Sequence, residues 1–192
     1  MSLVEINLLG PVELVVDGRA VAVGRKKQRA LLALLALRVG EVVSTDRLVL
    51  DLWGEKPPKA AVGSLQNLVS ELRRLIGAEV LVTRQPGYAL ELDPLHVDAR
   101  RFERAVREGT GLRDALGLWR GPPLGDLAYE PFAAAEIGRL EELRAVAWEE
   151  LFDADLGRGE HARLVPELER FIAEHPLRER PRAQLMLALY RS

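Results

Sequence analysis

The sequence has no cysteine, few aromatic residues and no long apolar run. Its 192 residues include no Cys, and aromatic side chains account for 5% of them. Without Cys, the chain has neither disulfides nor thiolate ligands for zinc. Its longest apolar run, residues 30–37, falls far short of the roughly 20 residues that span a bilayer. The N-terminus shows no charged segment followed by an apolar stretch, as a signal peptide would. We therefore expect a cytoplasmic protein with no membrane partner.

A strong excess of one charge is also absent. The 27 Lys and Arg residues face 29 Asp and Glu residues, which gives a net charge of -2. This balance argues against a protein that coats nucleic acid through its bulk charge. It does not exclude a site-specific DNA-binding protein, because docking depends on the local distribution of charge.

The motifs of common enzymes and metal sites are missing as well. The three histidines, His96, His161 and His175, are too scattered for a metal site. The chain has no P-loop, no dinucleotide-binding motif and no nucleophile elbow. Segment 121–126 contains glycine, but its two prolines lack the amide groups that would bind a phosphate. The sequence therefore predicts no enzyme, no cofactor and no metal.

The pattern of the sequence changes near residue 95. Apolar residues make up 48% of the chain, which is typical of a globular protein, and the length suits one large or two small domains. Strand and helix patterns are mixed before residue 95, whereas only helical patterns follow it. Asp93-Pro94 is a turn signal at this change. We predict two domains, residues 1–94 and residues 95–192.

The first half has the order sheet, three helices and hairpin. Val4, Ile6 and Leu8 alternate with outward positions as in a strand, and Asp17-Gly18 is typical of a hairpin turn. Three helices are expected: one over residues 25–37, a short one that begins after a cap at Ser44 or Thr45, and one over residues 59–76. Two strands, at residues 80–84 and 88–92, follow them. This order predicts an α+β winged helix-turn-helix with a small antiparallel sheet and a wing hairpin.

The helix expected over residues 59–76 has one apolar and one polar face. At 100° per residue, Leu65, Val69 and Leu72 share the apolar face. The opposite face is small and polar near its start and basic near its end, and comprises Lys59, Ala60, Gly63, Asn67, Ser70 and Arg74, with Ser64 and Glu71 at one margin.

This polar face suits the major groove of DNA. The amide of Asn67 can pair with adenine, and Ser64 is the second candidate for reading a base. Lys59 and Arg74 are candidates for phosphate contacts. The alternative is a solvated helix face, which has the same pattern.

A basic cluster, Arg25-Lys26-Lys27-Gln28-Arg29, lies at the start of the first expected helix, and its four cations could clamp a phosphate backbone. Lys26, Lys27 and Arg29 are candidates for clamping a phosphate backbone. Arg84, at the tip of the expected wing, is a further candidate for a phosphate or minor-groove contact. Such charges are more often solvated surface, so this alternative stays open.

The second half is expected to be an all-α, tetratricopeptide-like domain. Residues 132–156 and 162–173 form a predicted helical hairpin, with a turn at Gly157-Arg158-Gly159. Placing Pro176 at position 32 of a 34-residue repeat puts Trp148 at position 4. The next repeat would lack its second helix. We therefore expect a fragment of a longer protein, with a natural capping helix as the alternative.

These residues together resemble the Streptomyces antibiotic regulatory proteins, a family of actinobacterial transcription activators of secondary metabolism. The resemblance covers nearly the whole chain. It is carried in the first half by Leu8–Leu14, Lys27–Leu35, Leu52–Pro58, Leu65–Arg74 and Gly87-Tyr88, and in the second by Val97-Asp98, Leu118–Gly121, Glu174–Glu179 and Leu185–Ser192.

The resemblance implies an OmpR-like winged helix that binds direct repeats near promoters, followed by a bacterial transcriptional activation domain. It implies recruitment of RNA polymerase and a continuation into further helical repeats. Glu71 departs from the family, which usually has Arg there. An acid at this margin would repel phosphate, or accept a hydrogen bond from a cytosine amine and so read a base.

The predicted function is that of a sequence-specific DNA-binding transcription regulator of the activator type. Its partners would be double-stranded DNA and RNA polymerase, and monomers could assemble head to tail on tandem sites. One alternative is a protein-interaction scaffold whose winged helix makes only protein contacts. Another is a signal-transmitting fragment of a larger, ATP-using regulator.

Overall fold

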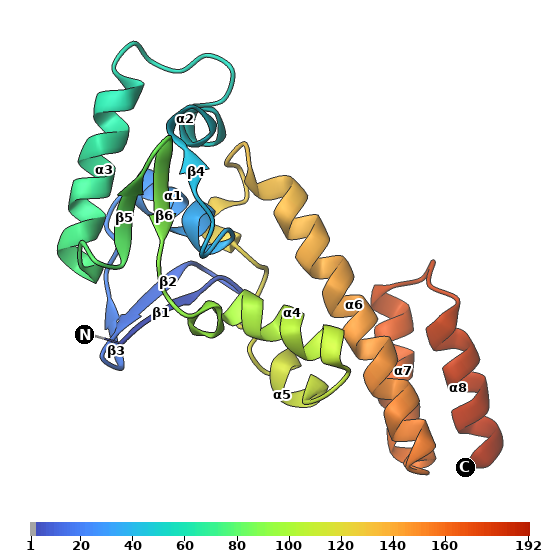
Figure 1. The fold of residues 1–192 in the computed structure, drawn as a ribbon. Helices are drawn as coiled ribbons and strands as arrows, with labels where there is room; N and C mark the ends of the chain where they lie inside the picture. Colours follow the sequence, from blue (N-terminus) through green and yellow to red (C-terminus); the bar gives the residue numbers. More distant parts are fainter. Residues whose placement is uncertain (1–2) are drawn as a thin grey trace.

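Two three-stranded antiparallel sheets frame the first half of the chain in the computed structural model, which describes residues 3–192 (Figure 1). The first sheet contains β1 (Val4–Asn7), β2 (Glu13–Val16) and β3 (Arg19–Val21) in that order. β2 and β3 are joined at Asp17 and Gly18, whose φ values of 49° and 75° are both positive. The predicted hairpin turn is therefore confirmed at these two residues.

The second sheet contains the wing. β5 (Leu81–Arg84) and β6 (Gly87–Leu90) form the predicted hairpin, and β6 also pairs with the two-residue strand β4 (Val43–Ser44). No sequence pattern predicted β4. Gly87 lies opposite Ser44, and a Cβ atom on Gly87 would overlap the carbonyl oxygen of Val43. Only glycine permits this close approach.

Three helices complete the winged helix. They are α1 (Lys26–Ala36), α2 (Thr45–Trp53) and α3 (Ala61–Ile76). Ser44 caps α2, because its hydroxyl accepts a hydrogen bond from the Arg47 amide at 3.2 Å. α1 is buried almost all round, and α3 buries the apolar stripe that its period predicts. The predicted fold class, an α+β winged helix-turn-helix followed by a helical domain, is confirmed.

The second half is helical. After the 3₁₀ turn η1 (Pro94–His96) come α4 (Asp98–Glu108) and α5 (Leu112–Leu116), and then η2 (Gly125–Leu127). The long helix α6 (Ala133–Gly157) runs from the winged helix out to α7 (His161–Glu174) and α8 (Arg180–Arg191), as Figure 1 shows. α7 packs on α6 and α8 through a second apolar cluster that includes Phe152, Leu164, Leu168, Phe171 and Ala188.

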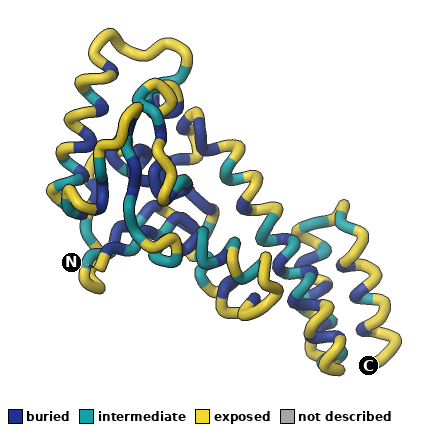
Figure 2. Tube along the Cα trace, viewed as in Figure 1, coloured by how far each residue is buried: buried dark blue, intermediate teal, exposed yellow. Residues whose placement is uncertain are grey.

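One apolar core crosses the predicted boundary at residue 94. It includes Ile6 of β1 and Leu31 of α1 together with Val97, Phe102 and Leu140 of the second half. In Figure 2 the buried segments continue from the first sheet into α4 and the start of α6. The two halves are therefore packed on one another through a shared apolar core.

The close approach at Gly87 generates a stability prediction. We expect Gly87→Ala to lower the free energy of unfolding by about 1–3 kcal/mol, because its Cβ would overlap the backbone of β4. Urea unfolding measures this change. The matched control is Gly138→Ala, at an exposed site within α6 with no heavy atom within 4 Å of the new Cβ. This control should gain about 0.5–1 kcal/mol from helix propensity. Equal effects of the two substitutions would contradict the close packing.

Candidate nucleic-acid interface

The outer face of α3 is exposed, small and polar. Leu65, Val69 and Leu72 are buried, whereas Asn67 and Arg74 are exposed. The remaining exposed residues are Val62, Gly63, Gln66 and Ser70, while Ser64 and Glu71 are half-buried. α3 lies at the edge of the molecule opposite α7 and α8 (Figure 1), and its outer side is exposed in Figure 2. This face is therefore open to a large partner.

The first turns of α3 offer little steric hindrance. A Cβ added to Gly63 would meet no heavy atom within 4 Å, and Ala60 precedes the helix with a short side chain. Ser64 and Asn67 lie next to Gly63 on the same side of the helix. A backbone that can be approached closely, beside amide and hydroxyl groups, is what reading base edges requires.

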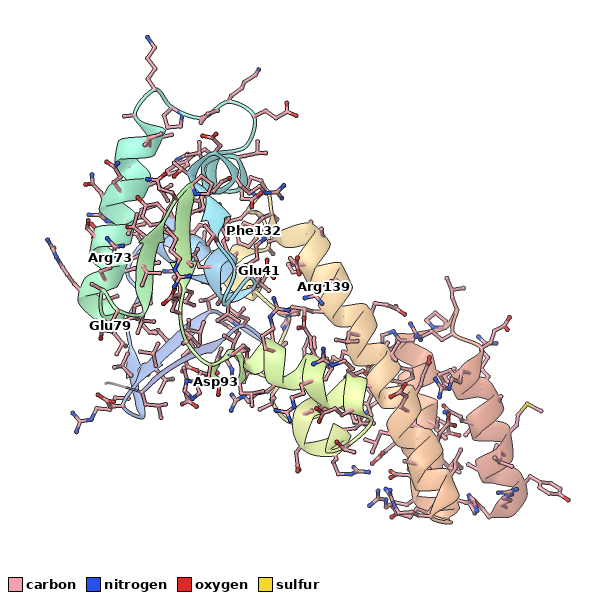
Figure 3. The ribbon with its side chains drawn as sticks, viewed as in Figure 1. Glu41, Arg73, Glu79, Asp93, Phe132 and Arg139 are labelled. Carbon is pink, nitrogen blue, oxygen red and sulfur yellow. The ribbon has the colours of Figure 1, made fainter. Side chains whose placement is uncertain are left out.

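Arg73 attaches the wing to α3. Its Nε donates to the Leu81 carbonyl at 2.7 Å, and its Nη2 donates to the Thr83 hydroxyl at 2.8 Å. Its guanidinium also lies 6.0 Å from the centre of the Tyr88 ring. Figure 3 shows Arg73 between α3 and the wing. Arg73 therefore fixes the wing relative to α3, whereas Arg74 remains exposed.

Three predicted phosphate-binding cations lie at the ends of α3 and at the tip of the wing. Arg84, at the wing tip, has a side chain that is 61% exposed, although its Nη2 lies 2.5 Å from the Glu91 carboxylate. Lys59 lies in the loop between α2 and α3, and Arg74 lies in the last turns of α3. Within residues 3–192, neither Lys59 nor Arg74 forms an ion pair. Both charges are available to a ligand.

The other three predicted phosphate-binding cations contact the second half of the chain. Lys26 and Lys27 lie 3.1 and 2.7 Å from the two carboxylate oxygens of Glu130. Arg29 donates to Asp126 at 2.6 Å, and Asp126 also accepts a hydrogen bond from the Val12 amide at 2.9 Å. The phosphate role of these cations stays a prediction, and their ion pairs argue for a different role. They hold the start of α1 to η2, through Asp126, and to the segment between η2 and α6, through Glu130.

The carboxylate of Glu71 forms an ion pair. Its Oε1 lies 3.2 Å from Nη1 of Arg25, the residue that precedes α1. Arg25 was predicted only as a member of the basic cluster at residues 25–29 and not as a partner of Glu71. Gln66, whose amide is exposed on α3, was not among the predicted site residues. The helical period would have placed Gln66 at the margin of the polar face opposite Ser64. No sequence signal links Arg25 to Glu71.

Within residues 3–192, no group of three or more His, Cys, Asp or Glu side chains is placed to hold a metal ion. In the same range no helix combines the length and the apolar character needed to cross a bilayer.

Comparisons with known proteins point to a single class. Residues 96–192 match the family described as bacterial transcriptional activator domain. Residues 19–90 match the family described as transcriptional regulatory protein, C terminal. A winged helix joined to helical repeats of this kind defines a DNA-binding transcription regulator.

Similar whole sequences narrow the class to a family. The chain is 37% identical to the regulatory protein DnrI of Streptomyces peucetius, covering 98% of this chain and 78% of DnrI. It is 40% identical to the regulatory protein AfsR of Streptomyces coelicolor, covering 97% of this chain but 20% of AfsR. With the transcriptional regulator RedD of Streptomyces coelicolor, it shares 35% identity over 98% of this chain and 59% of RedD.

A solved structure has the same fold. The structure of Mycobacterium tuberculosis EmbR in complex with a low-affinity phosphopeptide superposes with a TM-score of 0.92 at 33% identity, over all of this chain and 55% of that one. The chain belongs to the Streptomyces antibiotic regulatory protein family of transcription activators. It spans 20% to 78% of the lengths of the three named regulators.

The ion pairs of Glu130 generate a pH prediction. Burial alone would raise the pKa of Glu130, but the hydrogen bonds and the positive charges of Lys27 and Lys26 together outweigh it and lower this pKa below its ordinary value of 4.5. The stabilisation is therefore complete above that ordinary value and is lost as the pH falls through the lower, folded value. We expect Glu130→Gln to be less stable than the wild type at neutral pH, and the difference to shrink on acidification.

Urea unfolding between about pH 3 and pH 7 measures this convergence. Glu141→Gln is the matched control, because Glu141 is an exposed glutamate of α6 with no ion pair among residues 3–192. A stability difference for Glu130→Gln that does not change with pH would contradict the lowered pKa.

Proposed function

We propose that this protein acts in the cytoplasm as an activator that binds directly repeated DNA near promoters and recruits RNA polymerase. The observation that carries the proposal is the exposed polar face of α3, which lies beside the wing and away from α7 and α8. A winged helix inserts such a helix into the major groove, and its wing reaches the neighbouring backbone. The family membership supports the same function.

Asn67 is the leading candidate for reading a base, and Ser64 is the second. Asn67 is exposed, and the small residues one turn earlier let the DNA approach the helix closely. An amide that pairs with two atoms of adenine distinguishes A·T from the other base pairs. Glu71 remains a candidate for accepting from a cytosine amine, although its carboxylate is shared with Arg25.

Lys59, Arg74 and Arg84 are the candidates for phosphate contacts. Lys59 lies just before α3 and Arg74 near its end, at the two ends of the polar face, while Arg84 lies at the wing tip. Cations in such places fix the position of a protein on the duplex without reading its sequence.

The second half, from residue 95 onwards, is the proposed activation domain. α8 exposes apolar side chains, with Met186 at 72% and Tyr190 at 89% exposure, which suits a protein partner. Contacts between winged helices bound at tandem sites would let monomers assemble head to tail. The same exposed side chains favour the second candidate function, a protein-interaction scaffold that does not bind DNA.

Selection of bound sequences from a random duplex pool, followed by salt titration of the selected DNA, separates the two functions. Enrichment of a directly repeated motif with steep salt dependence supports the activator. Affinity no better than that for random DNA supports the scaffold.

A substitution at Asn67 tests base recognition. We expect Asn67→Ala to weaken binding by about 1–3 kcal/mol at one base pair and to relax specificity there, because the bidentate contact is lost. Fluorescence anisotropy with operators that vary at single positions measures this. Thr110→Ala, at an exposed position just after α4, is the control and should leave both affinity and specificity unchanged. Equal losses for Asn67→Ala on specific and random DNA would remove Asn67 as a reader.

Salt titration distinguishes the two groups of cations. Three phosphate contacts give a slope of about -3 per protomer in log affinity against log salt. We expect Lys59→Ala and Arg74→Ala each to reduce this slope by about one. Lys27→Met should leave it unchanged, because Lys27 is held by Glu130. A reduction for Lys27→Met equal to that for Lys59→Ala would instead assign the basic cluster of α1 to the phosphate backbone.

A further inference from the structure

Glu71 is the only carboxylate on α3, and it lies at the margin of the exposed face. It follows Asn67 by four residues and Ser64 by seven, so the three side chains share one side of the helix. A bare carboxylate here would repel the phosphates of DNA docked on α3. The fold must therefore compensate this charge if α3 is to enter the groove.

Arg25 supplies the compensating charge. Its Nη1 lies 3.2 Å from Oε1 of Glu71, and its side chain remains 74% exposed. Glu71 is its only carboxylate partner among residues 3–192. A guanidinium has five N–H donors in a planar fork, so one ion pair leaves donors available to a further acceptor. Arg25 is therefore able to contact Glu71 and a phosphate together.

The backbone of Arg25 is fixed in this position. Its carbonyl accepts hydrogen bonds from the amides of Gln28 and Arg29, each at 3.0 Å, as α1 begins. The next two side chains, Lys26 and Lys27, are held by Glu130. The first turn of α1 is thus anchored on the second half of the chain, and Arg25 projects from it towards α3.

We infer that Arg25 belongs to the DNA interface, where it neutralises Glu71 and donates to a phosphate at the edge of the exposed face of α3. The inference rests on the proposed DNA-binding function. Arg25 extends the interface from α3 and the wing to the start of α1. Without Arg25, the charge of Glu71 would weaken the binding of DNA to α3.

A double-mutant cycle tests this dependence. We expect Arg25→Ala to weaken binding to specific and random duplexes alike by about tenfold at 0.15 M salt, since one phosphate contact is worth about fivefold there. On random duplex, where a contact to one cytosine amine adds no affinity, Glu71→Gln should change wild-type binding little. In the Arg25→Ala background, Glu71→Gln should restore about twofold, because the uncompensated charge has been removed. Fluorescence anisotropy measures all four proteins.

The controls separate this inference from folding and from the proposed function. Urea unfolding should differ little among the four proteins, because exposed ion pairs contribute little stability. Arg107→Ala, at an exposed arginine of α4, should leave DNA affinity unchanged. Additive effects of Arg25→Ala and Glu71→Gln on DNA affinity, or no effect of Arg25→Ala, would overturn the inference. In that case, specific binding that still depends on Asn67 would uphold the proposed function. Absence of specific binding by the wild type would overturn both.

Discussion

The buried carboxylate of Asp98 is the contact on which the arrangement of the two halves depends. Its oxygens accept hydrogen bonds from the amides of Leu8 and Leu9, at 2.6 and 3.0 Å, and from Ala99 at 2.7 Å. Burial raises the pKa of Asp98 above its ordinary value, and the hydrogen bonds from these three amides offset only part of that rise. The carbonyls of Leu8 and Leu9 accept from Leu124 and Arg120, at 2.9 and 2.7 Å. The backbone that follows β1 therefore finds its partners in the second half, and separating the halves would leave these groups without them.

The first turn of α1 extends this connection to α3. Arg25 contacts Glu71 on one side, and Lys26 and Lys27 contact Glu130 on the other. The following turns of α1 are buried almost completely, so the helix is a rigid part of the core. A displacement of the segment around Glu130 would thus act on the edge of the proposed DNA interface. The ion pairs and the recognition face belong to one packed unit.

Local patterns predicted the elements of this fold, and tertiary contacts account for what they missed. The helical period identified the buried side of α3, and Asp17-Gly18 identified a hairpin. Both signals are local, because each is contained in a short stretch of sequence. The strand β4 has two residues and no period of its own, and it forms because Gly87 admits its backbone. The sequence around Lys27 suggests a phosphate-binding cation, because its actual partner, Glu130, lies 103 residues away and cannot be recognised from local sequence. Periodicity predicts which face is buried, but it does not predict which charges meet.

The distribution of charge decides how this protein would select its DNA. The net charge is -2, and three cations of the α1 cluster are already paired with Glu130 and Asp126. Few cations are left for the phosphate backbone, so nonspecific binding should be weak, and uncharged groups such as Asn67 should carry much of the discrimination. Because one apolar core joins the halves, the orientation of α3 in the groove also sets the direction in which α6 projects. Copies on direct repeats spaced by whole turns of about 10–10.5 base pairs would then present their helical halves on the same side of the duplex. Because the two halves are packed rigidly on one another, the spacing of the DNA repeats would set the spacing of the helical halves that a protein partner contacts.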